Sequence, residues 1–245
     1  MTTTTNVDPQ KIKSMFSKVA SGYDKANDIL SAGIHHLWRK KLVKMSGAKT
    51  GDAVLDCATG TGDLAIEFKK TVGTPGQVIG TDFCKEMLDF APAKAAKLNL
   101  PITFELADVT ALSYANNSFD ITSISFGIRN VADPVKGISE LARVTKPGGK
   151  VCVLEFGQIE NPALNKAYQF YSTKILPKIG GTITGETDAY EYLQNSSAQF
   201  PCRQDFVKLM NQAAQFSHVE CVPVSFGIAY IYIATKSTAD RKSVV

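Results

Sequence analysis

From residue 53 onward, two kinds of segment alternate along the chain. In one kind apolar residues form short runs, and in the other they recur at helical spacing. Five short apolar runs predict strands at 53–57, 77–82, 102–106, 119–125 and 150–156. Apolar residues at helical spacing predict helices between them, at about 63–71, 87–98 and 134–144. After a helix at 204–215, two closing strands at 218–223 and 228–235 are joined only by residues 224–227, which predicts an antiparallel pair at one sheet edge. The pattern predicts an α/β, Rossmann-like fold, with a seven-stranded, mostly parallel sheet that ends in an antiparallel hairpin.

Two segments depart from this alternation. Residues 1–48 hold helices expected from Asp8 to Gly22 and from 34 to 45, so we expect an N-terminal helical extension before a main domain at 49–236. An insertion at about 160–202 is expected to hold helices at 163–175 and 190–198, with a turn at Gly180 and Gly181 between them. Its many Tyr and Phe residues suit a lid over a substrate. Residues 237–245 are expected to be a tail.

The composition limits the number of domains, the class of partner and the cellular compartment that we expect. With 245 residues, 44% hydrophobic and 20% charged, the chain suits one α/β domain, and a net charge of +4 is too small to indicate nucleic-acid binding. Five scattered cysteines without a Cys-x-x-Cys pair predict neither disulfides nor a zinc site and favour a reducing compartment. The adjacent His35 and His36 are expected to point in different directions along a helix, so no metal is predicted. No targeting segment is visible and the longest apolar tract, 222–234, is too short to span a bilayer, so we expect a soluble, cytoplasmic protein.

A glycine-rich turn follows the first predicted strand. Gly60-x-Gly62-x-x-Ala65, with Asp82 further along, matches the dinucleotide fingerprint, which leaves an NAD(P)-dependent reductase open. However, Asp56 at the end of the strand suits an ammonium and a sulfonium and would repel a pyrophosphate. The closing hairpin is also common among methyltransferases and unusual in dinucleotide domains. These two features favour S-adenosylmethionine as the cofactor.

With this cofactor, carboxylates after successive strands have distinct roles. Asp82 can accept two hydrogen bonds from the ribose diol, and Asp108, with Ala107 beside it, would meet the exocyclic amine of adenine. Phe83 and Met87 would flank the adenine ring. Alternatively, Asp82 and Asp108 would cap helices or be solvated, and Met87 would be an ordinary core residue.

Several strings in the chain are more specific. They are Tyr23-Asp-Lys-Ala-Asn-Asp28, Gly33-Ile-His-His-Leu-Trp38, Asp56-Cys-Ala-Thr-Gly-Thr-Gly-Asp63, Ile121-Thr-Ser-Ile-Ser-Phe-Gly-Ile-Arg-Asn-Val131, Lys146-Pro-Gly-Gly149, Leu154-Glu-Phe156, Leu176-Pro-Lys-Ile-Gly180 and Tyr190-Glu-Tyr-Leu193. Together, over about residues 10–236, they resemble the ubiquinone/menaquinone biosynthesis C-methyltransferases, the UbiE/MenG group. The strings at 112–118 and 156–159 depart from the group's usual ones, and the second lies near the expected substrate cleft.

This resemblance implies a class I S-adenosylmethionine-dependent methyltransferase that methylates a ring carbon of a prenylated quinol, either a demethylmenaquinol or a polyprenyl benzoquinol. By position, the group's cofactor contacts correspond to Thr61, Asp82, Ala107, Asp108 and Ser125. Its substrate-ring contacts correspond to Tyr23, Arg129 and Asn130.

The chemistry of these residues limits their roles. Arg129 cannot act as an ordinary base, so we expect it to stabilise a phenolate or orient a water that carries the proton. Its structural alternative is an ion pair with Asp133, and that of Tyr23 is packing against Ile12 or Val19.

The surroundings of the site leave further alternatives. The basic segment 34–45 could touch anionic lipid at the inner face of the membrane or be a solvated helix face, and the insertion could shield the prenyl tail or form a homodimer surface. A non-catalytic scaffold subunit is the alternative to an enzyme. Nucleic acid is not expected as a substrate, because strand 119–125 ends in Ser125-Phe-Gly-Ile-Arg-Asn, without the Asn/Asp-Pro-Pro-aromatic turn that grips a flipped base.

Overall fold

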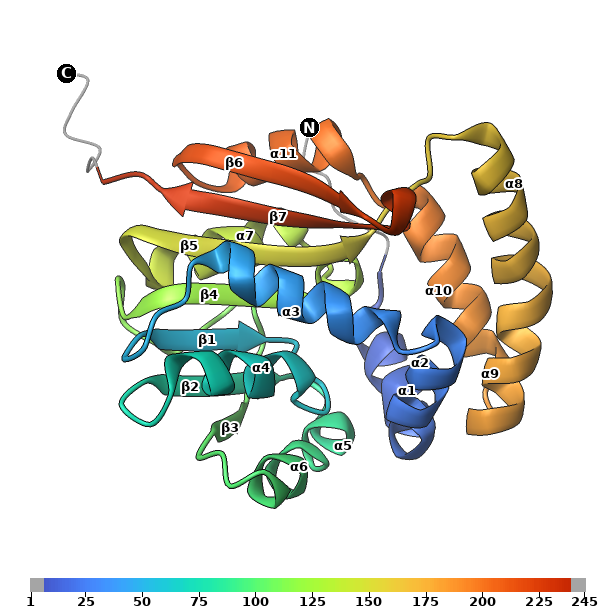
Figure 1. Ribbon diagram of the computed structural model, residues 1–245, viewed down its shortest axis with the longest axis horizontal. Helices are drawn as coiled ribbons and strands as arrows, with labels where there is room; N and C mark the ends of the chain where they lie inside the picture. Colours follow the sequence, from blue (N-terminus) through green and yellow to red (C-terminus); the bar gives the residue numbers. More distant parts are fainter. Residues whose placement is uncertain (1–6, 239–245) are drawn as a thin grey trace.

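A single twisted sheet forms the centre of the molecule (Figure 1). The computed structural model describes residues 7–238, so most of the predicted polar terminus and tail lie outside the described residues. Its seven strands have the order β3-β2-β1-β4-β5-β7-β6. They are β1 (Ala53–Cys57), β2 (Gln77–Asp82), β3 (Thr103–Leu106), β4 (Phe119–Ser125), β5 (Thr145–Phe156), β6 (Phe216–Val224) and β7 (Ala229–Lys236). β1 to β5 are parallel, and β7 is antiparallel to both β5 and β6, which confirms the predicted mostly parallel sheet and its closing hairpin.

Helices cover both faces of the sheet. On one face, α3 (Ile34–Ser46) and α4 (Asp63–Val72) bury Trp38, Leu42 and Phe68 against the strands. On the other, α7 (Pro134–Val144) and α11 (Arg203–Ala213) bury residues such as Leu141 and Phe206. α5 (Lys85–Leu88) and α6 (Ala91–Lys97) follow β2. The N-terminal helix α3 is therefore part of one core layer.

The string Lys146-Pro-Gly-Gly149 lies inside β5. Phe119 pairs with Thr145 and Ile121 with Lys150, so residues 146–149 loop out of the ladder as a bulge. Gly148 has a φ of +77° there, a conformation that favours glycine. The strand therefore begins five residues earlier than the predicted 150–156, because Thr145 pairs before the bulge.

Two groups of helices gather at the carboxyl ends of the parallel strands (Figure 1). The first contains α1 (Pro9–Val19), a short 3₁₀ turn (Ala20–Gly22) and α2 (Tyr23–Ser31), a helix that the sequence analysis did not predict. The second is the insertion, with α8 (Pro162–Phe170), a π-helical turn (Tyr171–Ile175), α9 (Leu176–Thr184) and α10 (Thr187–Gln199). Both groups therefore form a lid over this end of the sheet.

The predicted turn at Gly180 and Gly181 is wrong, because both residues lie within α9. A Cβ atom at Gly180 would lie 2.5 Å from the ring of Tyr190 on α10. The glycine therefore serves the close packing of two helices. Among the described residues, no helix is long and apolar enough to cross a bilayer.

Candidate active site

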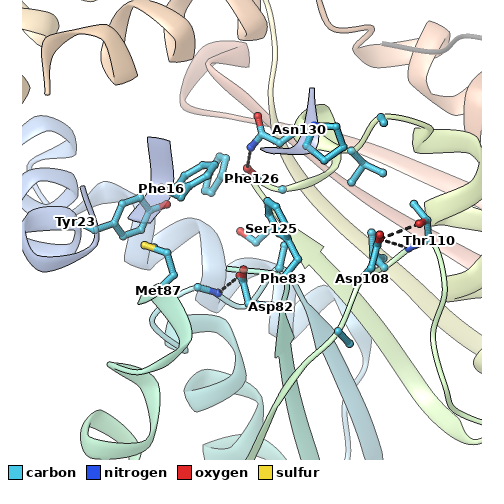
Figure 2. A pocket seen from close by; sticks show the side chains of 18 residues that line it. Phe16, Tyr23, Asp82, Phe83, Met87, Asp108, Thr110, Ser125, Phe126 and Asn130 are labelled. Carbon is cyan, nitrogen blue, oxygen red and sulfur yellow. Dashed lines mark hydrogen bonds between the residues drawn. The ribbon is translucent and has the colours of Figure 1, made fainter. Parts of the chain in front are cut away.

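A cavity of about 830 Å³ opens at the carboxyl ends of β1, β2, β3 and β4. Figure 2 shows the side chains that line it, which come from α1, α2, α5 and the loops after these strands. Seven of the predicted cofactor residues line its wall: Gly60, Asp82, Phe83, Met87, Ala107, Asp108 and Ser125. The structure thus brings together residues that are far apart in the sequence, as the topology of a parallel sheet requires.

Asp82 is fixed at the base of this cavity by the glycine-rich turn. The backbone N–H of Gly60 donates to its Oδ2 at 2.8 Å, and the N–H of Cys84 donates to its Oδ1 at 2.8 Å. Gly60 has a φ of +57°, so the turn adopts a conformation that suits glycine. Burial raises the pKa of Asp82, and the N–H donors partly offset that effect. The carboxylate keeps further lone pairs with which to accept hydrogen bonds from a diol.

Other polar groups of the cavity suit the remainder of a nucleoside. The Oδ1 of Asp108 accepts from the N–H of Thr110 at 2.8 Å and from its hydroxyl at 2.9 Å, which orients the carboxylate. Ser125 Oγ is buried and has no hydrogen-bond partner among residues 7–238. A buried hydroxyl without a hydrogen-bond partner costs free energy. This atom is therefore suited to bind a polar atom of a ligand. Phe83 and Met87 add apolar surface for a ring.

Three predicted cofactor residues do not line the cavity. Asp56 is buried beneath the turn, where Thr59 and Ser123 each donate a hydroxyl hydrogen bond of 2.7 Å to it. Burial raises the pKa of Asp56 to about 6. Thr61 donates to Asp24 of α2 at 2.6 Å, and Gly62, at the start of α4, packs against Ala91 of α6. These residues therefore stabilise the turn and connect it to neighbouring helices.

A second, larger cavity of about 1280 Å³ adjoins the first. Its wall is mainly apolar and is built from the N-terminal helices and the insertion, with Val19, Leu30, Ile34, Trp38, Tyr168, Tyr171, Leu176, Tyr190 and Leu193 among its lining residues. Phe16, Tyr23 and Phe126 line both cavities. The two spaces therefore meet at these three aromatic side chains.

Arg129 lies beside this junction, in the 3₁₀ turn Ile128–Asn130 after β4. Its Nη1 donates to Glu155 Oε1 at 2.8 Å and to the carbonyl of Phe126 at 2.6 Å. The guanidinium carbon lies 5.4 Å from the centre of the Phe156 ring, within reach of a cation–π interaction. The predicted alternative of an ion pair with Asp133 is wrong. Asp133 instead caps α7 by accepting from the N–H of Lys136 at 2.9 Å.

Asn130 and Tyr23 complete the polar groups at the junction. Asn130 lines the first cavity, and its side-chain oxygen accepts a hydrogen bond of 3.0 Å from the hydroxyl of Tyr192 on α10. The Tyr23 ring meets that of Phe16 edge-on, with centroids 6.3 Å apart. Burial raises the pKa of the Tyr23 hydroxyl. Packing against Ile12 or Val19 was the alternative for Tyr23, but its hydrophobic neighbours are Phe16, Ala20, Phe83, Cys84 and Met87.

The sequence analysis missed the site roles of Phe16, Phe126, Glu155 and Tyr192. Glu155 and Tyr192 occur in the strings Leu154-Glu-Phe156 and Tyr190-Glu-Tyr-Leu193, so motif membership was a usable indication for both. Nothing in the local pattern distinguished Phe16 from an ordinary core residue of an amphipathic helix.

The two adjacent histidines lie together, contrary to the prediction that they point apart. Their ring centroids are 4.0 Å apart, and His36 Nε2 lies 2.7 Å from Asp28 Oδ1. One ligand atom each of Asp28, His35 and His36 lies within 4.8 Å of the others. Burial lowers the pKa of His35 to about 4, so this ring is neutral at neutral pH. The absence of a metal stays a prediction.

The order of the strands and the glycine-rich turn after β1 identify the fold. It is the fold of the S-adenosylmethionine-dependent methyltransferases. A methyltransferase of this kind from Aquifex aeolicus superposes with a TM-score of 0.58 at 20% identity, over 93% of this chain and 98% of that one. Phosphoethanolamine N-methyltransferase 2 of Haemonchus contortus, in complex with S-adenosylmethionine, gives a TM-score of 0.60 at 17% identity, over 82% of this chain and 52% of that one.

The family follows from the sequence. The sequence model of the ubiE/COQ5 methyltransferase family matches residues 4–236, so the chain belongs to this family. A relative in Bdellovibrio bacteriovorus, called ubiquinone/menaquinone biosynthesis C-methyltransferase UbiE, is 66% identical over 93% of this chain and 96% of its own length. The protein is therefore an enzyme, a methyltransferase, and the reductase alternative is wrong.

Proposed function

We propose that the enzyme transfers a methyl group from S-adenosylmethionine to a ring carbon of a prenylated quinol, a demethylmenaquinol or a 2-polyprenyl-6-methoxy-1,4-benzoquinol. The observation that carries the proposal is the meeting of two cavities at Phe16, Tyr23 and Phe126: a smaller one whose wall holds Asp82, Asp108 and Ser125, and a larger one that is mainly apolar. A polar cofactor and a lipophilic acceptor need two such spaces, with the reacting atoms at their junction. The name of the relative in Bdellovibrio bacteriovorus supports the same acceptor.

Residues of the first cavity would hold the cofactor. Asp82 accepts from the ribose hydroxyls, Asp108 accepts from the adenine amine, and Phe83 and Met87 pack on the ring. The unpartnered Ser125 hydroxyl gains a hydrogen-bond partner in the bound state. The cofactor, when bound, supplies an electrophilic methyl group on a sulfonium.

At the junction, the enzyme must make the quinol ring electron-rich. Loss of a hydroxyl proton does this, because the phenolate donates charge to the neighbouring ring carbon. The Arg129 guanidinium, held by Glu155 and buried among Phe126 and Phe156, stabilises that negative charge in a site of low polarity. A guanidinium does not act as an ordinary base, so a water takes the phenol proton. After the carbon–carbon bond has formed, a water takes the ring proton and the phenol oxygen regains a proton, so that one proton is released overall.

The second cavity would hold the prenyl tail. Tyr168, Tyr171, Leu176 and Leu193 of the insertion supply apolar surface on one side, and α1 to α3 supply it on the other. This arrangement supports the interpretation of the insertion as a shield for the tail. A homodimer formed through its outer surface is the other proposal, which the molecular mass in solution tests. With such a substrate, the enzyme would work at the inner face of the membrane.

The proposed function is tested by incubating the protein with methyl-labelled S-adenosylmethionine and a panel of short-tailed quinols that differ in the ring. Label on a ring carbon of a naphthoquinol or a methoxybenzoquinol is expected, and the better acceptor identifies the pathway. Binding of S-adenosylmethionine without label on any quinol would contradict the proposed acceptor. It would favour a different acceptor.

A further inference from the structure

The outward face of α3 carries two exposed apolar residues followed by three lysines. Ile34 and Leu37 are exposed near the start of the helix, and Leu37 is 61% exposed. Lys40, Lys41 and Lys44 are exposed further along. Spacings of three and four residues place these side chains on the same side of the helix. α3 contains no acidic residue, so its outward face is apolar at one end and positively charged at the other.

A strained turn places a further apolar ring beside this helix. In the 3₁₀ turn Ser225–Gly227 between β6 and β7, Ser225 and Phe226 have φ angles of 44° and 60°. Residues other than glycine rarely adopt this conformation, so it costs free energy. The turn nevertheless leaves the Phe226 ring 80% exposed, so burial of that ring in the protein does not offset the cost. The Trp38 Nε1–H donates to Ser225 Oγ at 2.9 Å, which ties the turn to α3.

The wall of the apolar cavity includes residues of this region. Ile34 lines the cavity and is also exposed, and Trp38, Ser225 and Ile228 line it as well. Leu37 comes directly before Trp38 in the chain, and Phe226 comes directly after Ser225. The exposed apolar side chains are therefore neighbours of residues that line the cavity we assign to the prenyl tail.

We infer that this surface, which we call the docking face and define as Ile34, Leu37, Lys40, Lys41, Lys44 and Phe226, docks on a bilayer of anionic phospholipid. Leu37 and Phe226 enter the boundary between headgroups and acyl chains, and the three lysines bind lipid phosphates. Anionic headgroups complement the charge of α3, and acyl chains complement its exposed apolar end. A docked enzyme would let a prenyl tail pass from the bilayer into the cavity without crossing water.

The inference rests on the proposed function only for that last step, and it can be tested without catalysis. Sedimentation with vesicles of equal parts phosphatidylcholine and phosphatidylglycerol measures binding directly, with pure phosphatidylcholine as the neutral comparison. The wild-type protein is expected to bind the anionic vesicles and to be released as salt screens the lysines. Lys40→Gln/Lys41→Gln/Lys44→Gln should reduce the partition coefficient by about tenfold or more, since each lysine near an anionic surface contributes to binding.

The apolar part is tested with Leu37→Gln/Phe226→Asn, in which Gln keeps the helix and Asn tolerates the positive φ. This variant should also bind the vesicles at least about tenfold more weakly, because two large apolar side chains no longer leave water. Matched controls change exposed residues elsewhere: Leu98→Gln/Phe90→Asn, and Lys85→Gln/Lys97→Gln/Lys208→Gln. The controls should bind as the wild-type protein does.

Measurements of methyl transfer distinguish failure of this inference from failure of the proposed function. The docking-face variants should methylate a water-soluble, short-tailed quinol at the wild-type rate but a long-tailed quinol in anionic vesicles more slowly. Methylation of no quinol would contradict the proposed function and leave the vesicle result valid. Failure of the wild-type protein to bind anionic vesicles, or equal binding by all variants, would overturn the inference. A change of molecular mass in the variants, without a change in vesicle binding, would instead make this face a dimer interface.

Discussion

Tyr192 of the insertion donates a hydrogen bond of 3.0 Å to the side-chain oxygen of Asn130, which follows β4. Asn130 Nδ2 in turn faces the carbonyl of Phe126 at 3.4 Å. These contacts fix the orientation of the Asn130 amide from two sides, and one of them comes from the lid. The position of α10 is therefore coupled to the geometry of a residue at the junction of the two cavities.

Tyr192→Phe removes this hydrogen bond and leaves the ring. The loss of one hydrogen bond of about 1 kcal/mol should reduce kcat by roughly fivefold, with little effect on the Kd of S-adenosylmethionine. Steady-state kinetics and calorimetric titration measure the two quantities. Tyr171→Phe is the control, because it removes a lid hydrogen bond to the carbonyl of Leu30 and leaves Asn130 untouched. Equal losses of kcat in both variants would show a general loosening of the lid.

Asp82→Ala should abolish cofactor binding. Two hydrogen bonds from a diol to a carboxylate are lost, together about 3 kcal/mol or more, which corresponds to at least roughly a hundredfold weaker binding. Calorimetric titration with S-adenosylmethionine measures the change. Asp89→Ala serves as the control, because Asp89 is exposed in an ion pair with Lys85. An unchanged Kd for the Asp82 variant would remove it from the cofactor site.

Arg129→Ala should spare cofactor binding and lose turnover. The substitution also leaves Glu155 buried without its ion-pair partner, which should lower the free energy of unfolding by about 3–5 kcal/mol. Urea unfolding and single-turnover methyl transfer measure these two effects. Arg129→Met/Glu155→Gln removes both charges, so it should recover most of the stability while turnover stays absent. Wild-type turnover in either variant would refute the role of the guanidinium.

Asp56 should make stability depend on pH. Burial raises its pKa from 3.8 to about 6, so between these values the folded protein binds more protons than the unfolded chain. The free energy of unfolding should therefore fall as pH rises through about 6, with a contribution from Asp56 of the order of 3 kcal/mol.

Asp56→Asn has no such titration, which makes it the matched comparison in urea unfolding between about pH 3 and 8, a range that spans both pKa values. The variant should gain stability relative to the wild-type protein as pH rises. A constant difference across this range would show that Asp56 has an ordinary pKa.

The sequence predicted the sheet well, because each of the first five strands is a short segment that contains apolar, mostly β-branched or aromatic residues and is bounded by turn residues. β1, β2 and β4 have the predicted bounds. α2 was missed because Tyr23-Asp-Lys-Ala-Asn-Asp-Ile-Leu-Ser buries only Ala26 completely and shows no clear apolar period. Gly180 was misinterpreted because close packing and a turn both require glycine, and local sequence does not distinguish them.

Predictions for the site were best where a residue follows a strand directly. Asp82, Asp108 and Ser125 reach the cavity because their strands end there. Asp56 also ends a strand, but Thr59 and Ser123 hold it under the turn. The partner of Arg129 was predicted wrongly because Asp133 is near in sequence, whereas Glu155 is near only after β4 and β5 have paired. Contacts of this kind depend on the tertiary structure.

The place of β7 in the sheet has a consequence for synthesis of the chain. β7 follows β6 in sequence but lies between β5 and β6 and pairs with both. Until residues 229–236 leave the ribosome, the free edge of β5 and the whole of β6 have no partner. The nascent chain therefore exposes the unpaired edge of β5 from the synthesis of Phe156 until that of β7, and chaperones that shield such edges would act in this interval.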